Sequence, residues 1–225
     1  MDLRGIFEGK EDLRYQEEAS ALAGEIGRWI IQHNEDTPIE SLFHRRRIRD
    51  TIGYIMNVRS MGVEGDYDDL NFGFIEGGTA EAFMAMGTDE RRKAYFVFVR
   101  VPDAGSKTDI MYSVKWSHLI HELTHYIDRK RSETKPSKAP ETKEIYYNSP
   151  MEFNAYFHQG LYDVMLHNHR NVPDNFPEFL RQNQVSFDYS WREHMTPDTK
   201  RKFIRRLYGV WNSLMDRQGA SLMAA

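Results

Sequence analysis

Apolar side chains recur at the spacing of an α-helix in several stretches of the chain, which are therefore predicted to be helical. The first covers about residues 12–34. The second begins at Thr37, a suitable N-cap, has Pro38 at its first helical position, and ends near Arg59. Further helices are predicted over about residues 111–131, 149–169, 175–184 and 197–217. The apolar stripes of three of these helices are Leu22, Ile26, Ile30 and Ile31; Met111, Val114, Leu119, Ile120, Leu123 and Ile127; and Phe203, Leu207, Trp211 and Leu214.

Three shorter segments have the composition of β-strands. Residues 93–101 are rich in β-branched and aromatic side chains, and Pro102-Asp103-Ala104-Gly105 forms a turn signal after them. Residues 70–76 and 80–86 are separated by Gly77-Gly78-Thr79, which is typical of a hairpin. These segments predict a small mixed or antiparallel sheet. Together with the helices, they indicate an α+β fold.

Composition and charge exclude several classes of protein. The net charge of −4 gives no general attraction to nucleic acids or to anionic membranes. The run from His44 to Arg49 is interpreted as the solvated face of the second helix, with a nucleic-acid patch as the less favoured alternative. The chain has no cysteine, which excludes thiolate metal ligands, disulfides and thiol catalysis. No segment looks like a signal peptide or a membrane span, so we expect a soluble cytoplasmic protein.

The residues that carry recognisable chemistry are His121-Glu122-Leu123-Thr124-His125, a complete HExxH motif. On a helix, His121 and His125 lie one turn apart on the same side, where both imidazoles can reach one tetrahedral Zn²⁺. Glu122 falls beside them, in position to take a proton from a water activated by the metal. The alternative is a coincidental polar helix face. The motif therefore predicts a zinc site with Glu122 as the catalytic base.

A catalytic zinc site needs a third protein ligand, and Glu152 is the best downstream candidate. The extended HExxHxxGxxH motif is absent, because Asp128 and Arg131 occupy its last two defined positions. The run Tyr146-Tyr147-Asn148-Ser149-Pro150-Met151-Glu152-Phe153 begins the helix that follows the motif.

The HExxH helix and the helix that carries Glu152 resemble those of the gluzincin-type, thermolysin-like metallopeptidases. The resemblance covers about residues 93–168 and extends to short zincin-like proteins of bacteriophages and bacteria. The resemblance implies His121, His125 and Glu152 as ligands, Glu122 as the base, and a zincin-like fold. Separately from the resemblance, we expect a catalytic core over residues 61–218, after a helical part over 1–60 and before a frayed tail over 219–225. We expect these parts to form one compact domain.

Two alternatives to Glu152 as a ligand remain open. Ser149-Pro150-Met151-Glu152 is a capping box, in which Glu152 would bond to the Ser149 amide instead of a metal. His158 is a rival ligand, but it lies about 120° around the helix from Glu152, so only one of the two faces the metal.

Further side chains are candidates for supporting roles. The hydroxyl of Tyr156 or Tyr147 is placed to stabilise an oxyanion, although a packed tyrosine is the simpler reading of each. Asp128 is placed to orient a ligand imidazole, and His118 to contact a substrate, or both are ordinary helix residues. An extended peptide would pair with strand 93–101 as an edge strand. Basic residues at 129–138, in a mobile loop predicted over Arg129–Lys143, would tune the choice of substrate.

These expectations make a zinc-dependent peptidase the predicted function, with a protein or peptide as the substrate and with neither nucleic acid nor membrane as a partner. A zinc hydrolase for a non-peptide amide would use the same site. A non-catalytic binding or structural protein would use the metal only to brace two helices, and would not need Glu122.

Overall fold

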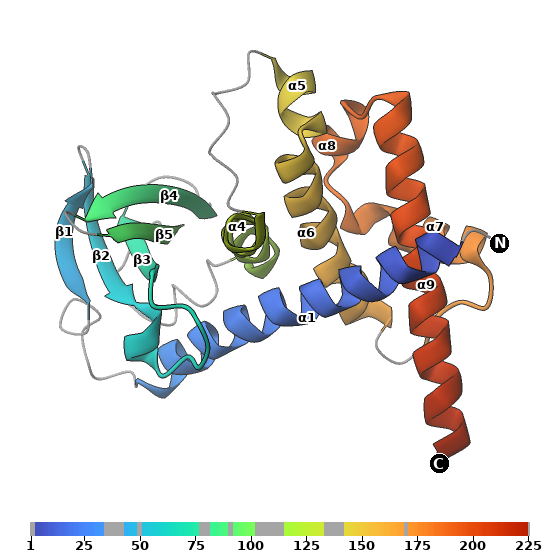
Figure 1. The fold of residues 1–225 in the computed structure, drawn as a ribbon, viewed down its shortest axis with the longest axis horizontal. Coiled ribbons are helices and arrows are strands. Elements are labelled where there is room, and N and C mark those ends of the chain that lie inside the picture. The colour runs from blue at the N-terminus through green and yellow to red at the C-terminus, as the bar shows by residue number, and fades with distance from the viewer. Residues whose placement is uncertain are drawn as a thin grey trace. The chain divides into compact units, whose positions relative to one another are not determined.

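A computed structural model of the protein describes residues 3–33, 43–48, 51–76, 82–89, 92–101, 115–132, 142–168 and 171–224. The chain forms two compact units, one made of Met1–Glu18 with Glu133–Ala225 and the other of Ala19–Ser132. Helix α1 (Leu3–Gln32) begins in the first unit and ends in the second (Figure 1). The α+β class is confirmed. The boundary near residue 60 and the single core over 61–218 remain predictions.

The unit Ala19–Ser132 contains a five-stranded mixed sheet with the strand order β1-β2-β3-β5-β4. Strands β3 and β5 pair in parallel, and every other neighbouring pair is antiparallel. The strands are β1 (His44–Ile48), β2 (Thr51–Asn57), β3 (Leu70–Glu76), β4 (Ala82–Asp89) and β5 (Arg92–Val101), and a 3₁₀ turn, η1, covers Val58–Met61. The mixed sheet was predicted, but two of its strands and its pairing were not.

The helix predicted from Thr37 to Arg59 is wrong over its described part, because residues 44–48 and 51–57 are the paired strands of the β1–β2 hairpin. The hairpin pairs His44 with Ile55 and Ile48 with Thr51. Tyr54 and Ile55 point to opposite faces of the sheet and are both buried. A strand buried on both faces lacks the alternation that identifies strands, and its apolar residues then match a helical pattern by accident. Residues 37–42 lie outside the described part of the chain.

The hairpin predicted between residues 70–76 and 80–86 is also wrong. Both segments are strands, but β5 lies between them and pairs with each. The hairpin is instead formed by β4 and β5, in register from Ala82 opposite Val99 to Asp89 opposite Arg92. Strand β5 is therefore an inner strand, so residues 93–101 do not provide the predicted edge. The edges of the sheet are β1 and β4.

Helix α4 (Trp116–Ser132), which carries the HExxH motif, packs against β4 and β5 (Figure 1). The predicted apolar side is confirmed, since Leu119, Ile120, Leu123 and Ile127 are all buried. Met111, Val114 and the turn at 102–105 lie outside the described residues. The helix extends four residues into the segment predicted as a loop, of which residues 133–141 are likewise not described.

The other unit is helical. It contains α5 (Lys143–Asn148), α6 (Pro150–Asn168), α7 (Phe176–Asn183), the 3₁₀ turn η2 (Gln184–Ser186), α8 (Tyr189–Glu193) and α9 (Pro197–Ala224), together with the start of α1. Its core is aromatic and includes Phe153, Phe157, Phe179, Phe187 and Trp191.

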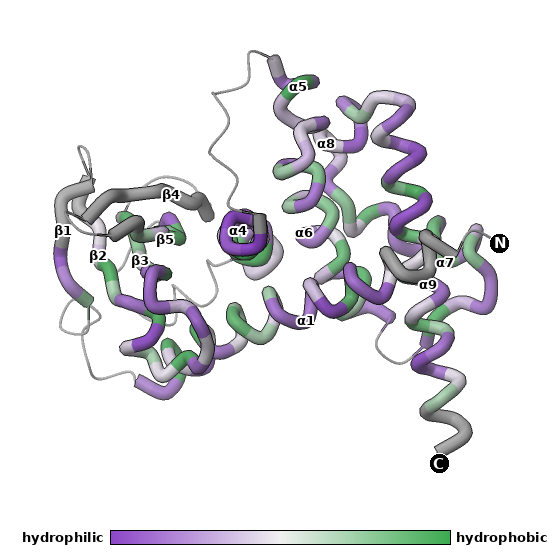
Figure 2. The backbone as a smooth tube through the Cα atoms, viewed as in Figure 1, coloured by the Kyte–Doolittle hydropathy of each residue, from purple (hydrophilic) through white to green (hydrophobic). Residues whose placement is uncertain are grey.

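Helices α6, α7 and α9 confirm the predicted helices in this part of the chain. Hydrophilic and hydrophobic residues alternate along α1 and α9, as expected for helices with one buried side (Figure 2). Helix α9 continues to Ala224, through the tail that was predicted to fray. In α1, Leu22, Ile26 and Ile30 are buried as predicted, but Ile31 is 63% exposed. Within the described ranges, none of the helices combines the length and apolar character required to cross a membrane.

Two glycines of α1 give a matched stability test. A Cβ added at Gly24 would meet no atom within 4 Å, whereas at Gly27 it would lie 2.7 Å from Cη2 of Trp116. Gly24→Ala is expected to raise the free energy of unfolding by roughly 0.5–1 kcal/mol, because alanine reduces the entropy cost of forming the helix. Gly27→Ala is expected to lower it by about 1–3 kcal/mol, because the indole must move. Urea denaturation measures both, and equal shifts would contradict the close packing of Trp116 on α1.

Candidate metal centre

The two histidines of the HExxH motif form a buried pair on α4. The exposed fractions of His121 and His125 are 6% and 7%. Their ring centroids lie 4.8 Å apart with the rings nearly perpendicular, as expected for neighbours one helical turn apart. Glu122 is half-buried beside them. Residues on the other side of α4 are packed in the core. This packing restricts rotation of α4 about its axis and so fixes the direction in which the two histidines project.

A polar cluster fixes α4 just after the motif. The Tyr126 hydroxyl donates a hydrogen bond to Asp69 Oδ1 at 2.7 Å. Lys130 Nζ lies 3.0 Å from Asp66 Oδ2 and 3.5 Å from Asp69 Oδ1. Burial and the hydrogen bond to Asp69 raise the pKa of Tyr126 above its ordinary value, so the hydroxyl stays protonated and continues to donate. The cluster ties the helix to the segment that leads into β3.

Sequence reasoning missed this cluster and gave Lys130 a role in substrate choice. In the structure, Lys130 is engaged by two carboxylates of its own unit, and the role in substrate choice remains a prediction. The acidic partners lie about 60 residues earlier in the chain, and no local pattern links them to the motif. Residues 133–138, the rest of the predicted basic segment, lie outside the described part of the chain.

Glu152 lies in the first turn of α6, and the contacts of Ser149 bear on its role. Ser149 Oγ accepts a hydrogen bond from the Glu152 amide at 3.3 Å, so Ser149 does cap the helix. In a capping box, the Glu152 carboxylate would accept a hydrogen bond from the Ser149 amide. That amide instead donates to the Tyr146 carbonyl at 3.1 Å, at the end of α5. The helix start is therefore capped without using the Glu152 side chain for this bond.

The contacts of His158 do not favour it as a ligand. Only 1% of its surface is exposed, and its ring stacks on Tyr15 at 4.4 Å. Nδ1 lies 2.9 Å from Gln16 Oε1, and Nε2 lies 3.4 Å from Arg206 Nη2. Since Arg206 only donates, Nε2 accepts and the proton is on Nδ1, which donates to Gln16. Both ring nitrogens are therefore engaged by α1 and α9.

Arg206 is the centre of a buried network on this side of α6. Its guanidinium forms a two-pronged ion pair with Asp12, with Nε 3.0 Å from Oδ2 and Nη2 bonded to Oδ1. Nη2 also donates to Asn154 Oδ1 at 2.9 Å, and the group lies over the ring of Phe157 at 4.1 Å. Two residues along a helix correspond to about 200°, so Glu152 projects from the side of α6 opposite to Asn154. No sequence signal pointed to Arg206 or Asp12.

The two candidate tyrosines pack together in the helical unit. Their ring centroids lie 5.3 Å apart, and Tyr156 stacks on Trp191 at 5.7 Å. The Tyr147 hydroxyl lies 3.4 Å from Ser190 Oγ. Burial, together with the nearby Tyr146, Tyr147 and Glu152, raises the pKa of Tyr156 above its usual range. The Tyr156 hydroxyl is therefore a protonated donor near neutral pH, but the action of either tyrosine on an oxyanion remains a prediction.

The roles suggested for two residues of α4 also remain predictions. Asp128 and His118 are both half-buried on this helix.

Of the three predicted ligands, His121 and His125 belong to the unit Ala19–Ser132 and Glu152 belongs to the helical unit, so the three together remain a proposed donor set. Two imidazoles and one carboxylate are a donor set that suits zinc and leaves a coordination position open. The absence of cysteine from the chain is consistent with a site of this type.

No protein-family model matches this chain, and the comparisons with curated proteins and with solved structures also found no match. The likeness to gluzincins therefore remains a resemblance that rests on the HExxH motif and Glu152.

Proposed function

We propose that the protein is a zinc-dependent metallopeptidase, in which His121, His125 and Glu152 hold the metal and Glu122 is the general base. The observation that carries this proposal is the buried histidine pair on one side of α4, with Glu122 beside it. Two imidazoles one helical turn apart on the same side can bind one zinc ion through a nitrogen of each ring.

The presence of Glu122 supports a catalytic site over a structural one. Structural zinc sites are usually closed by four protein ligands and need no base. Here three protein ligands are proposed, and the residue that follows the first histidine is a carboxylate. A non-catalytic protein that used the metal to brace α4 and α6 would bind zinc equally well, but replacement of Glu122 would then have no functional effect.

The proposed mechanism assigns one task to each side chain. When bound, zinc acts as a Lewis acid and lowers the pKa of a water molecule towards about 7. Glu122 removes a proton from the attacking water and transfers it to the departing amine. A hydroxyl from Tyr156 or Tyr147 donates a hydrogen bond to the oxygen that gains negative charge. The alternative substrate is a non-peptide amide, which would need the same groups but no extended binding strand.

Strand β4 takes the place of residues 93–101 as the proposed binding strand for a peptide. It is the last strand of the sheet, and α4 packs beside it. The outer side of an edge strand presents backbone N–H and C=O groups, with which an extended peptide can pair. The possibility of pairing with this edge strand favours a peptide substrate over a small amide.

Replacement of Glu152 by Gln tests the metal site. Glu152→Gln is expected to lower zinc affinity by more than the roughly 10–100-fold typical of losing an outer-shell partner, because an amide is a poor zinc ligand. Zinc affinity is measured by competition with a chromogenic chelator, and metal content by mass spectrometry.

Ser149→Ala is the matched control, since it removes the helix cap and is expected to cost about 1 kcal/mol of stability while leaving zinc affinity unchanged. Retention of zinc in Glu152→Gln, with its loss in His158→Ala, would show a three-histidine site instead.

A further inference from the structure

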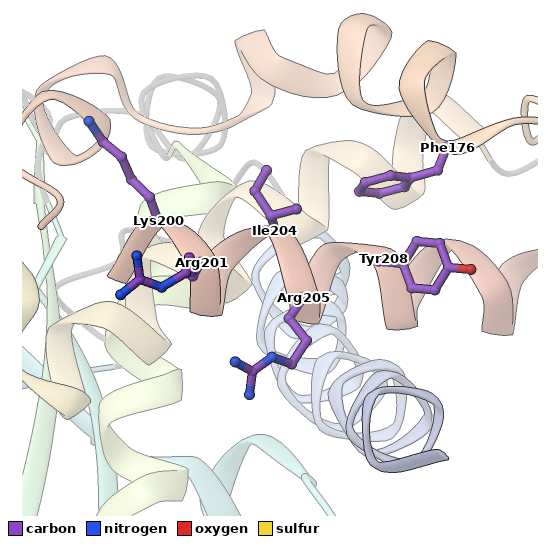
Figure 3. A pocket seen from close by; sticks show the side chains of 6 residues that line it. All are labelled: Phe176, Lys200, Arg201, Ile204, Arg205 and Tyr208. Carbon is purple, nitrogen blue, oxygen red and sulfur yellow. The ribbon is translucent and has the colours of Figure 1, made fainter. Parts of the chain in front are cut away.

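A shallow groove of about 550 Å³ lies along α9 in the helical unit. Its side chains are Phe176 from α7 and Lys200, Arg201, Ile204, Arg205 and Tyr208 from α9 (Figure 3). The lining is mostly apolar, and the volume is within the range of ligand sites in proteins. The groove thus combines an apolar floor with three basic side chains.

Neighbouring aromatic side chains and one hydrogen bond fix the apolar side chains that form the floor of the groove. Phe176 packs edge-on against Tyr208, with ring centroids 5.1 Å apart, and lies 5.9 Å from Trp211. Trp211 Nε1 donates a hydrogen bond to the Pro173 carbonyl at 2.8 Å. Ile204, beside these rings, is 39% exposed. A binding partner would therefore meet a preformed surface and would not have to order it.

The basic side chains of this part of α9 divide into two sets. Lys202 lies over the Phe153 ring, and Arg206 pairs with Asp12. Lys200, Arg201 and Arg205 are exposed at the groove. Arg201 pairs with Asp198, but for Lys200 and Arg205 the described part of the chain supplies no ion pair. Arg201 and Arg205 are also one turn apart, where like charges destabilise a helix.

We propose that this groove binds an acidic segment of a partner protein, in which an apolar side chain lies between carboxylates. The carboxylates would pair with Arg205 and Lys200, and the apolar side chain would cover Ile204 against Phe176. Arginine binds carboxylates through two parallel hydrogen bonds, so the pairing is directional as well as electrostatic.

The dimensions and chemistry of the groove favour a peptide over other anions. Lys200 and Tyr208 are eight residues apart, which corresponds to about 12 Å along the helix. A strand of roughly four residues has this length. Single-stranded nucleic acids bind through stacking on aromatic faces, whereas the two aromatic rings of this groove, Phe176 and Tyr208, are packed edge-on against each other. The proposal is independent of the metal site and of peptidase activity.

The test is binding of a fluorescein-labelled peptide in which Glu and Leu alternate, followed by fluorescence anisotropy with the full-length protein. The double substitution Lys200→Glu with Arg205→Glu is expected to weaken binding by about tenfold or more, because two attractions become repulsions. Ile204→Ser is expected to weaken it several-fold. Lys143→Glu on α5 is the matched control for a single charge reversal at an exposed lysine outside the groove, and should change affinity by less than about twofold.

Circular dichroism confirms that each variant folds, which is expected because the altered side chains are exposed. Weakening by both groove variants, with no effect of Lys143→Glu, supports the proposal. Failure of the wild-type protein to bind the peptide would overturn it, as would equal binding by all variants. It would also be overturned if oligothymidylate or vesicles of anionic lipid bound at this groove and the peptide did not.

Discussion

A Glu122→Gln variant is expected to keep its metal and its fold while losing peptide hydrolysis by about 10²–10⁴-fold, because the substitution removes the general base and little else. Glu122 is half-buried beside the histidine pair, and glutamine has nearly the same shape. The loss should appear in kcat, since proton transfer is needed only in the transition state. The measurement combines metal content by mass spectrometry with cleavage of a peptide library.

The control for this experiment is the wild-type protein treated with a chelator and then given Zn²⁺ again. Activity that disappears with the chelator and returns with zinc belongs to a metal site, and the Glu122→Gln protein should not recover under the same treatment. Equal cleavage by the wild type and the variant would assign the activity to a contaminant or to another site. Equal metal content with no cleavage by either protein would favour the non-catalytic alternative.

An Arg206→Met variant is expected to lower the free energy of unfolding by about 3–5 kcal/mol, because it leaves the buried Asp12 carboxylate without its partner. The side chains of Arg206 and Asp12 are only 11% and 10% exposed. Methionine retains much of the apolar stem of arginine, so the loss reflects the ion pair more than the packing. Urea denaturation followed by circular dichroism measures the effect.

Arg217→Met provides a matched control between the same two helices. Arg217 pairs with Glu17 of α1, but these side chains are 52% and 49% exposed. Exposed ion pairs contribute at most about 1 kcal/mol, so the control should change stability little. The double variant Asp12→Leu with Arg206→Met should recover part of the loss, since no charge is then buried. Similar effects of Arg206→Met and Arg217→Met would mean that the Asp12 pair is solvated.

The sequence predicted the parts of this protein that depend on local spacing. The apolar side of α4 repeats every three or four residues, so the position of His121 and His125 on one face followed directly. The start of α6 was also predictable, because Ser149-Pro150 is a local signal. The cap formed by Ser149 was confirmed, whereas the metal-binding role of Glu152 remains a proposal.

Features that depend on distant parts of the chain were not predictable from these patterns. Strand β5 lies between β3 and β4 because of pairing across the sheet, which no turn signal encodes. Strand β2 is buried on both faces at Tyr54 and Ile55, so its pattern was mistaken for a helix. The ion pair of Asp12 with Arg206 joins residues at opposite ends of the chain. Each partner alone looks like an ordinary charged helix residue.

The division of the chain has a consequence for how the protein is made. The helical unit needs both Met1–Glu18 and Glu133–Ala225, whereas the unit with the sheet is one continuous segment, Ala19–Ser132. During synthesis from the N-terminus, the sheet and α4 are therefore complete before any residue of α6 has been made. The two histidines are therefore part of a folded helix before the first residues of α1 can pack against α6 and α9. Under this order of events, a metal ion that needs Glu152 as well as the histidines is bound only after α6 has also been synthesised.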